Sequence, residues 1–250
     1  MDLELQGKTG LVTGASSGIG RGIALGLGQE GVRLALVARR TDRLEEVADA
    51  IVEAGGVRPE IIGADFLDPK SPAVIAQAAE NALGVIEILV NNAGGSRHFS
   101  LATSDADWEE AMTLNFVRHR QLTSALLPKM MEHGYGRIIN ITGKSEPDGI
   151  NGAFAAKAAM HSWAKGLSRE VGKFGITVNS VPPGRIMSEQ ILRNYTPEYR
   201  EWQSEHEIPI GEYGQPEDVA ALVTFLASAR ARYLTGTVIP VDGGLRRYQF

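Results

Sequence analysis

The glycine-rich stretch at residues 13–20, TGASSGIG, constrains this chain more than any other feature. Residues 8–12 are typical of a short buried strand, and apolar residues recur at helical spacing from Ile19 onward. Glycines between a strand and a helix let a pyrophosphate reach the backbone at the helix N-terminus, where free N–H groups favour negative charge. Ordinary turns also use glycine, but the strand before this turn and the helix after it favour a dinucleotide site. Its predicted contacts are Gly14, Ser16, Ser17, Gly18, Ile19 and Gly20.

Two arginines give a second cofactor signal about 20 residues later, at the offset expected for a ribose contact. Residues 33–38 predict a buried strand, and Arg39 and Arg40 follow it where NAD sites carry an acidic residue. A guanidinium matches a phosphate with a bidentate fork. The pair therefore favours NADP(H) over NAD(H), and the alternative is a solvated surface loop.

Two later strands end in residues suited to a cofactor. Residues 60–64 predict a strand that runs into Asp65, which can accept from an adenine amino group, and Phe66, whose ring can cover the base. Residues 86–90 predict another strand, followed by the sequence NNAG, which suits a tight chain end against a cofactor; a simple Asx turn is the alternative. The predicted cofactor contacts here are Asp65, Phe66, Asn91, Ala93 and Gly94.

Composition excludes several classes of protein. A chain of 250 residues without a linker or low-complexity run suits one α/β domain, residues 1–250. The net charge of −5 without a basic stripe argues against nucleic acid, and no apolar run approaches the ~20 residues of a membrane span. Without cysteine there is no thiolate metal ligand or nucleophile, and no metal is expected. The acidic N-terminus is unlike a signal peptide, so we expect a cytoplasmic protein.

Further motifs follow the first ones along the whole chain: TLNF at 113–116, GRIINI at 136–141, ITVNSVPPG at 176–184 and LTGTVIPVDGG at 234–244. With TGxxxGIG and NNAG, in this order, they resemble the short-chain dehydrogenase/reductase family, and in general character its 3-oxoacyl-carrier-protein-reductase-like members. The resemblance implies a doubly wound Rossmann domain with a seven-stranded parallel sheet and helices on both faces. It also implies a homotetramer and NADP(H)-dependent interconversion of a carbonyl and an alcohol.

The resemblance also implies a catalytic set that this chain does not complete. The family uses Ser, Tyr and Lys, with tyrosine four residues before lysine, so that the ammonium favours the phenolate. Lys157 matches the lysine, but Ala153 stands at the tyrosine position and Gly143 at the serine position. Asn115, within a predicted helical region at 105–131, matches the family's asparagine, which makes a helix irregularity and binds a water; a satisfied polar core residue is the alternative.

Other groups are candidates for the two absent ones. Lys144 or Ser145 could polarise a substrate carbonyl, and a carboxylate of Glu146 or Asp148 could act as acid or base, unless the loop is merely solvated. The segment at about 188–207 covers the substrate in this family and is expected to be mobile. Its candidates for proton transfer are Tyr195, Tyr199 and His206, with Trp202 nearby.

The loop expected to hold the nicotinamide matches the family, with Pro183, Gly184, Ile186 and Ser188 as its predicted contacts. The sequence thus indicates an NADP(H)-binding protein acting on a small carbonyl or alcohol through an atypical active site. Two alternatives remain at this point. One is a cofactor-binding homologue without dehydrogenase activity, and the other is a lyase or isomerase that uses Lys157 differently.

Overall fold

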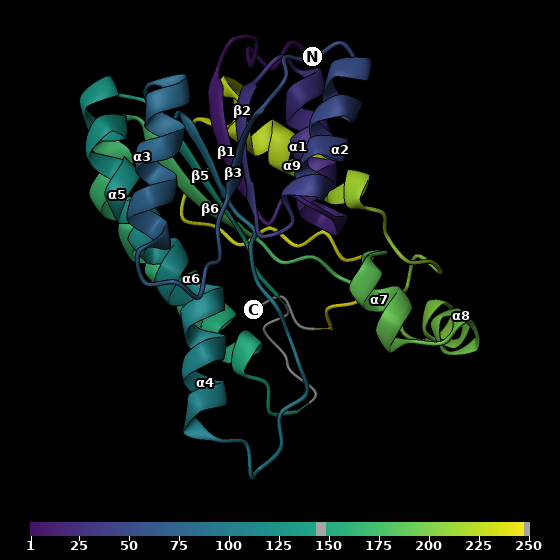
Figure 1. Cartoon of the computed structure of the whole chain (residues 1–250). Coiled ribbons are helices and arrows are strands. Elements are labelled where there is room, and N and C mark those ends of the chain that lie inside the picture. Colours follow the sequence, from purple (N-terminus) through teal and green to yellow (C-terminus); the bar gives the residue numbers. More distant parts are fainter. Residues whose placement is uncertain (144–148, 248–250) are drawn as a thin grey trace.

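A computed structural model describes residues 1–143 and 149–247. Its centre is a parallel sheet with the strand order β3-β2-β1-β4-β5-β6 (Figure 1). The order reverses between β1 and β4, which is where doubly wound folds bind their ligands. The strands are β1 (Thr9–Thr13), β2 (Arg33–Ala38), β3 (Glu60–Gly63), β4 (Ile88–Asn91), β5 (Gly136–Ile141) and β6 (Ile176–Val181).

Helices cover both faces of this sheet, as predicted (Figure 1). One apolar core joins the sheet to α1 (Gly18–Gln29), α2 (Thr41–Glu53) and α9 (Pro216–Ala227). The other core joins it to α3 (Ser71–Leu83), α5 (Arg118–His133) and α6 (Gly152–Val171). Every residue of β1, β4, β5 and β6 is buried, because parallel strands are covered on both faces.

The resemblance predicted seven strands, but the described residues form a six-stranded sheet. Residues 236–241 lie parallel to β6 and to the residues just after it, and they pair through isolated bridges, Ser180 with Val238 and Pro183 with Val241, and not through a regular ladder. The backbone N–H groups of Ser180 and Gly184 donate to this segment, but Pro182, between them, has no N–H to donate. The ladder is therefore interrupted where a regular seventh strand would continue.

The long helical region is irregular where the sequence predicted it. It begins with α4 (Asp105–Met112), passes through a π-helical turn at Thr113–Val117 and continues as α5. Asn115 is the buried residue of that turn, and such bulges are frequent at functional sites.

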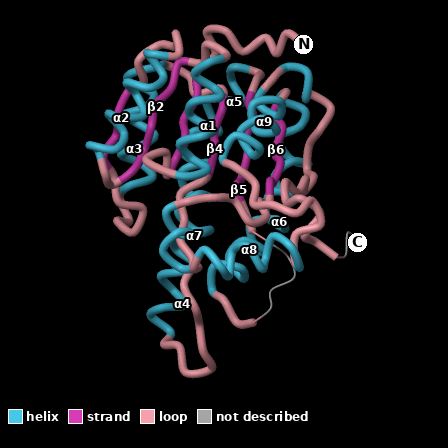
Figure 2. The backbone as a smooth tube through the Cα atoms, turned by 90° about the vertical axis from the view of Figure 1, so that its right-hand side faces the viewer, coloured by secondary structure: helices cyan, strands magenta, loops and turns pink. Residues whose placement is uncertain are grey.

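Two short helices lie beyond the carboxyl ends of the strands, α7 (Glu189–Asn194) and α8 (Pro197–His206) (Figure 2). They belong to the substrate-covering segment predicted at 188–207. Within the described ranges no helix has the length and apolar character needed to cross a membrane.

Candidate active site

The glycine turn has the geometry that a phosphate site needs. Gly14 has a φ of 66°, and a Cβ on Gly20 would collide with the carbonyl oxygen of Gly14. Ser17 is the N-cap of α1, but its hydroxyl makes no capping hydrogen bond. The first N–H groups of α1, which begin at Gly18 and Ile19, therefore point at a place where an anion can bind them.

Hydrogen bonds between side chains and the backbone tie this turn to the end of β4. Thr13 Oγ1 accepts from the N–H groups of Asn92 at 2.9 Å and Ala93 at 3.0 Å. Asn92 Nδ2 donates to the carbonyl oxygen of Thr13 at 2.9 Å. Neither Thr13 nor Asn92 was among the predicted cofactor contacts, although Thr13 ends β1 and Asn92 follows β4 at the reversal of strand order.

Arg40 joins the predicted serines of the turn. Its Nη2 donates to Ser17 Oγ at 3.0 Å and to Ser16 Oγ at 3.4 Å, and its Nη1 pairs with Glu189 Oε2 of α7 at 3.1 Å. Arg39 is also exposed but makes no hydrogen bond to a described residue. One guanidinium and two hydroxyls thus converge beside the glycine turn, a donor set that suits a phosphate.

Two predicted cofactor contacts have buried side chains instead. The Phe66 ring is 4% exposed and packs on His119, with centroids 5.1 Å apart, so the expectation that it covers an adenine is wrong. Burying an apolar ring in the core is favourable and draws it away from the surface. The Asn91 side chain is also in the interior and donates to Asn140 Oδ1 at 2.9 Å, so that only its backbone faces the site. Asp65 is exposed and accepts from the N–H of Leu67 at 3.0 Å.

Lys157 of α6 reaches the predicted cofactor loops. Its Nζ donates to the carbonyl oxygen of Ile141 at 2.8 Å, and a Cβ on Gly94 would lie 3.4 Å from that Nζ. Burial lowers the pKa of Lys157 to about 8 because the charged form loses its hydration. The ammonium can donate to further oxygens, since it carries three N–H groups.

Asn115 holds the loop beside Lys157. Its Nδ2 donates to the carbonyl oxygens of Ala111 at 2.9 Å and Gly95 at 3.0 Å, and its Oδ1 accepts from the Gly95 N–H at 3.2 Å. The side chain is buried and its amide makes three hydrogen bonds to the backbone. Asn115 therefore connects the π-helical turn to Gly95, directly after the NNAG loop.

Small residues, Gly143 and Ala153, stand at the two positions that the resemblance assigns to serine and tyrosine. A Cβ on Gly143 would lie 3.6 Å from the Phe154 ring. Ala153 is buried and lines a small cavity of about 200 Å³ together with Ser96 and Asn115. The candidates Lys144 and Ser145, with Glu146 and Asp148, lie outside the described residues.

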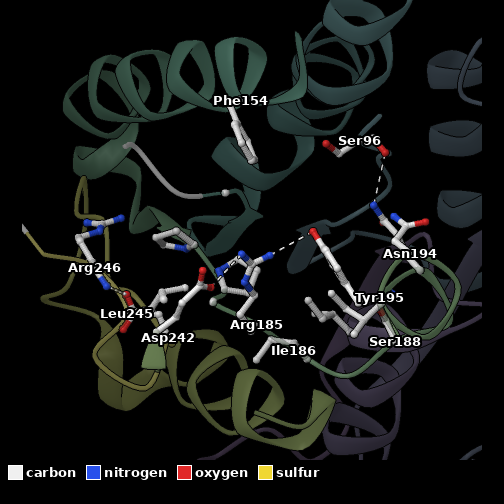
Figure 3. Close-up of a pocket in the computed structure, with 18 of the residues that line it drawn as sticks. Ser96, Phe154, Arg185, Ile186, Ser188, Asn194, Tyr195, Asp242, Leu245 and Arg246 are labelled. Carbon is white, nitrogen blue, oxygen red and sulfur yellow. Dashed lines mark hydrogen bonds and ion pairs between the residues drawn. The ribbon is translucent and has the colours of Figure 1, made fainter. Parts of the chain in front are cut away.

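A larger cavity of about 630 Å³ opens at the carboxyl ends of the strands. Figure 3 shows it between α6, the loop after β6, α7 and the C-terminal segment. The predicted nicotinamide contacts line it together with Ile19 of α1: Pro183, Gly184, Ile186 and Ser188. The structure thus brings the glycine turn and the nicotinamide loop to one cavity.

One tyrosine of the segment predicted to cover the substrate, 188–207, faces this cavity. Tyr195 lines it, and its hydroxyl accepts from Arg185 Nη1 at 3.3 Å (Figure 3). Tyr199 stacks on Tyr195 and is 43% exposed, and Trp202 and His206 continue the stack along α8. The geometry therefore separates Tyr195 from the other candidates of the segment.

Three basic residues that no sequence pattern predicted also line the cavity: Arg185, Arg246 and Arg247. His161, one turn after Lys157 on α6, contacts Thr142 Oγ1 through Nε2 at 2.7 Å. Burial, with the nearby charge of Arg246 and of Lys157, lowers the pKa of His161 to about 4.

Comparisons with known proteins agree with this geometry. The family model described as enoyl-(acyl carrier protein) reductase matches residues 14–246. The 3-oxoacyl-[acyl-carrier-protein] reductase FabG of Pseudomonas aeruginosa is 37% identical over 247 residues, which cover 97% of this chain and 99% of the relative.

Solved structures share the fold over nearly the whole chain. L-sorbose reductase from Gluconobacter frateurii, complexed with NADPH and L-sorbose, has a TM-score of 0.92 at 31% identity, covering 100% of both chains. A short-chain type dehydrogenase/reductase from Mycobacterium marinum has a TM-score of 0.91 at 31% identity, covering 99% of both chains. This chain belongs to the short-chain dehydrogenase/reductase family, whose members are NAD(P)-dependent oxidoreductases.

Proposed function

We propose that this protein is an NADP(H)-dependent oxidoreductase that interconverts a carbonyl compound and an alcohol, in the manner of the 3-oxoacyl-carrier-protein reductases. The observation that carries the proposal is Lys157, a buried ammonium beside Gly94 and Asn115 at the reversal of strand order. There it can donate to ribose hydroxyls and hold a proton close to the reacting oxygen. The cofactor, when bound, supplies or accepts the hydride.

The phosphorylated cofactor is supported by Arg40, Ser16 and Ser17, which together offer one cation and two hydroxyls. The related L-sorbose reductase is complexed with NADPH, and a putative gluconate 5-dehydrogenase from Beutenbergia cavernae holds NADP. We assign the remaining cofactor contacts to the glycine turn, Asp65, the backbone from Asn91 to Gly94, and the loop at 183–188.

We propose further that the active site is atypical. Ala153 and Gly143 carry no hydroxyl, so the proton reaches the substrate oxygen from another group. In the described part of the chain that group is Tyr195, whose hydroxyl lies in the cavity and donates to no described residue. Lys144 and Ser145 remain candidates for polarising the carbonyl.

We also expect a cytoplasmic homotetramer built from single-domain subunits, with a small-molecule substrate and neither nucleic acid nor membrane as a partner. Sedimentation of the purified protein tests the tetramer. A monomer at micromolar concentration would contradict it.

The function is tested by NADPH binding, measured by fluorescence, and then by NADPH oxidation with acetoacetyl-coenzyme A, acetoacetate and a series of small ketones. We expect binding and turnover, and turnover should be lost in Lys157→Met. Binding without oxidation of NADPH by any of these compounds would contradict the reductase. That result would favour a cofactor-binding homologue or a non-redox enzyme on the same scaffold.

A further inference from the structure

The charged residues around the large cavity are unbalanced. Three arginines line it, Arg185, Arg246 and Arg247, against two carboxylates, Glu207 and Asp242. Among the described lining residues one cation is therefore in excess. The nicotinamide of a bound cofactor carries no anion that could balance it there, because its phosphates belong at the glycine turn.

Both carboxylates are already engaged by the protein. Glu207 Oε2 accepts from Arg185 Nη2 at 3.3 Å and from Gln203 Nε2 at 2.8 Å. The two oxygens of Asp242 accept from the backbone N–H groups of Gly244 at 3.0 Å and Arg246 at 3.2 Å. Neither carboxylate needs a cation from a substrate.

The arginines, by contrast, keep unused donors. Arg185 Nε and Arg246 Nη2 are both buried, and neither has a hydrogen-bond partner among the described residues. Burying a guanidinium N–H without an acceptor costs free energy, and it is rare unless an acceptor arrives from outside. The two arginines come from different parts of the chain, the loop after β6 and the C-terminal segment, yet both line this one cavity (Figure 3).

We infer that the compound reduced here carries a carboxylate, which accepts from Arg246 or Arg185 beside the nicotinamide loop. The inference rests on the proposed function and narrows its substrate to oxo acids and their hydroxy acids. Hydride moves from the reduced nicotinamide to the carbonyl carbon and a proton moves to the carbonyl oxygen, giving a hydroxy acid and the oxidised cofactor. A carboxylate matches the planar guanidinium, and small size follows because the nicotinamide shares the 630 Å³ cavity.

The choice of variants follows from the other contacts of these residues. Arg185 also binds Glu207 and Tyr195, so removing its charge could loosen the substrate-covering segment. Arg246→Gln is therefore the principal variant. Arg185→Lys keeps the charge and removes the planar fork. Arg193→Gln is the matched control, because Arg193 is exposed on α7 and does not line the cavity.

The first experiment measures binding without turnover. Malonate, and separately its neutral diamide, is titrated calorimetrically into the protein–NADPH complex at fixed ionic strength. We expect malonate to bind the wild type and Arg193→Gln alike, at least tenfold more weakly to Arg246→Gln and Arg185→Lys, and malonamide to bind none of them. Equal binding of the two probes, no malonate binding, or unchanged affinity in Arg246→Gln would overturn the inference. Inorganic phosphate binding better than malonate would overturn the choice of a carboxylate.

The second experiment compares the turnover of acetoacetate with that of methyl acetoacetate. We expect kcat/KM to favour the acid at least tenfold in the wild type and this ratio to vanish in Arg246→Gln. Malonate binding through Arg246 without any NADPH oxidation would contradict the proposed function and leave the anion site intact. Turnover of acid and ester with equal kcat/KM would support the proposed function and contradict the anion site.

Discussion

The two sides of the large cavity differ in what holds them together. On the cofactor side, Thr13 and Asn92 tie the glycine turn to the end of β4 by hydrogen bonds that each join one side chain to the backbone. On the substrate side, contacts run between side chains, such as Arg185 with Tyr195 and Glu207. A bond from a side chain to the backbone depends on the identity of one residue only. A contact between two side chains depends on both residues, so a few substitutions can change the substrate side more readily than the cofactor side.

The largest effect should come from Lys157, where the two sides meet. Lys157→Met keeps the length of the side chain and removes the charge, and we expect kcat to fall ~10²–10⁴-fold, the usual contribution of a positioned proton-transfer group. The pKa of about 8 also predicts that wild-type turnover declines as the pH rises through 8, because the ammonium loses its proton. Lys165→Met, on an exposed turn of α6, is the control. Similar kcat values for Lys157→Met and Lys165→Met would show that Lys157 takes no part in the reaction.

The Tyr195→Phe variant tests whether a residue on the substrate side of the cavity supplies the proton. Tyr195→Phe should lower kcat by about 10²-fold with little change in KM, at the lower end of the range for such groups. Tyr199→Phe changes the neighbouring ring of the same stack outside the cavity and should leave kcat unaltered. If both variants keep the wild-type rate, the proton donor lies in the segment 144–148.

Arg40 and Arg39 form a matched pair on the cofactor side. Each charged hydrogen bond to a phosphate contributes ~1.5–3 kcal/mol, so Arg40→Ala should weaken NADPH binding ~10–150-fold and leave NADH binding nearly unchanged. Arg39→Ala should have a smaller effect, because Arg39 makes no hydrogen bond to the serines. Fluorescence titration with both cofactors measures this, and equal weakening of NADPH and NADH would contradict the assignment of the phosphate.

A smaller effect concerns the pH dependence of the free energy of unfolding, which His119, beneath the cofactor side, should change. Its buried Nε2 contacts the carbonyl oxygen of Ala93 at 2.6 Å, and burial, with the charge of Lys157, lowers its pKa to about 3. The unfolded chain takes up this proton near pH 6.5 and the folded chain only near 3, so stability is complete above 6.5 and falls as the pH drops towards 3. At pH 5 the loss is about 2 kcal/mol.

Urea unfolding at pH 7.5 and pH 5 measures this loss. The difference between the two pH values should shrink in His119→Gln and persist in His206→Gln, since His206 is exposed on α8. Part of the difference should remain in His119→Gln, because the pKa of His161 is also low. An unchanged difference in His119→Gln would contradict the assignment.

Most of the fold follows from local patterns in the sequence. The strand at 33–38 matches β2 in full, and the strand at 60–64 ends within one residue of β3, because apolar runs and turn residues bound them clearly. The irregular seventh strand could have been anticipated from Pro182, whose missing N–H breaks the ladder.

The site was harder to predict where packing decides it. Glycine positions and strand ends showed where a cofactor binds, because a close backbone approach leaves a mark in the sequence. The inward turn of Phe66 depends on the packing partner His119, 53 positions later, which no local pattern reveals. Arg185 and Arg246 are 61 positions apart in the sequence, so only the folded chain shows that they line one cavity.

The ion pair between Arg40 and Glu189 has a consequence for the order of events in a catalytic cycle. In the free protein this pair connects the end of β2 to the first turn of α7. A phosphate that binds Arg40 competes with the Glu189 carboxylate, and an exposed pair of this kind gives way easily. The arriving cofactor thereby frees the first turn of α7 before a substrate meets it. We therefore expect an ordered mechanism in which NADP(H) binds before the substrate. NADH lacks that phosphate, so its binding should not break the ion pair between Arg40 and Glu189.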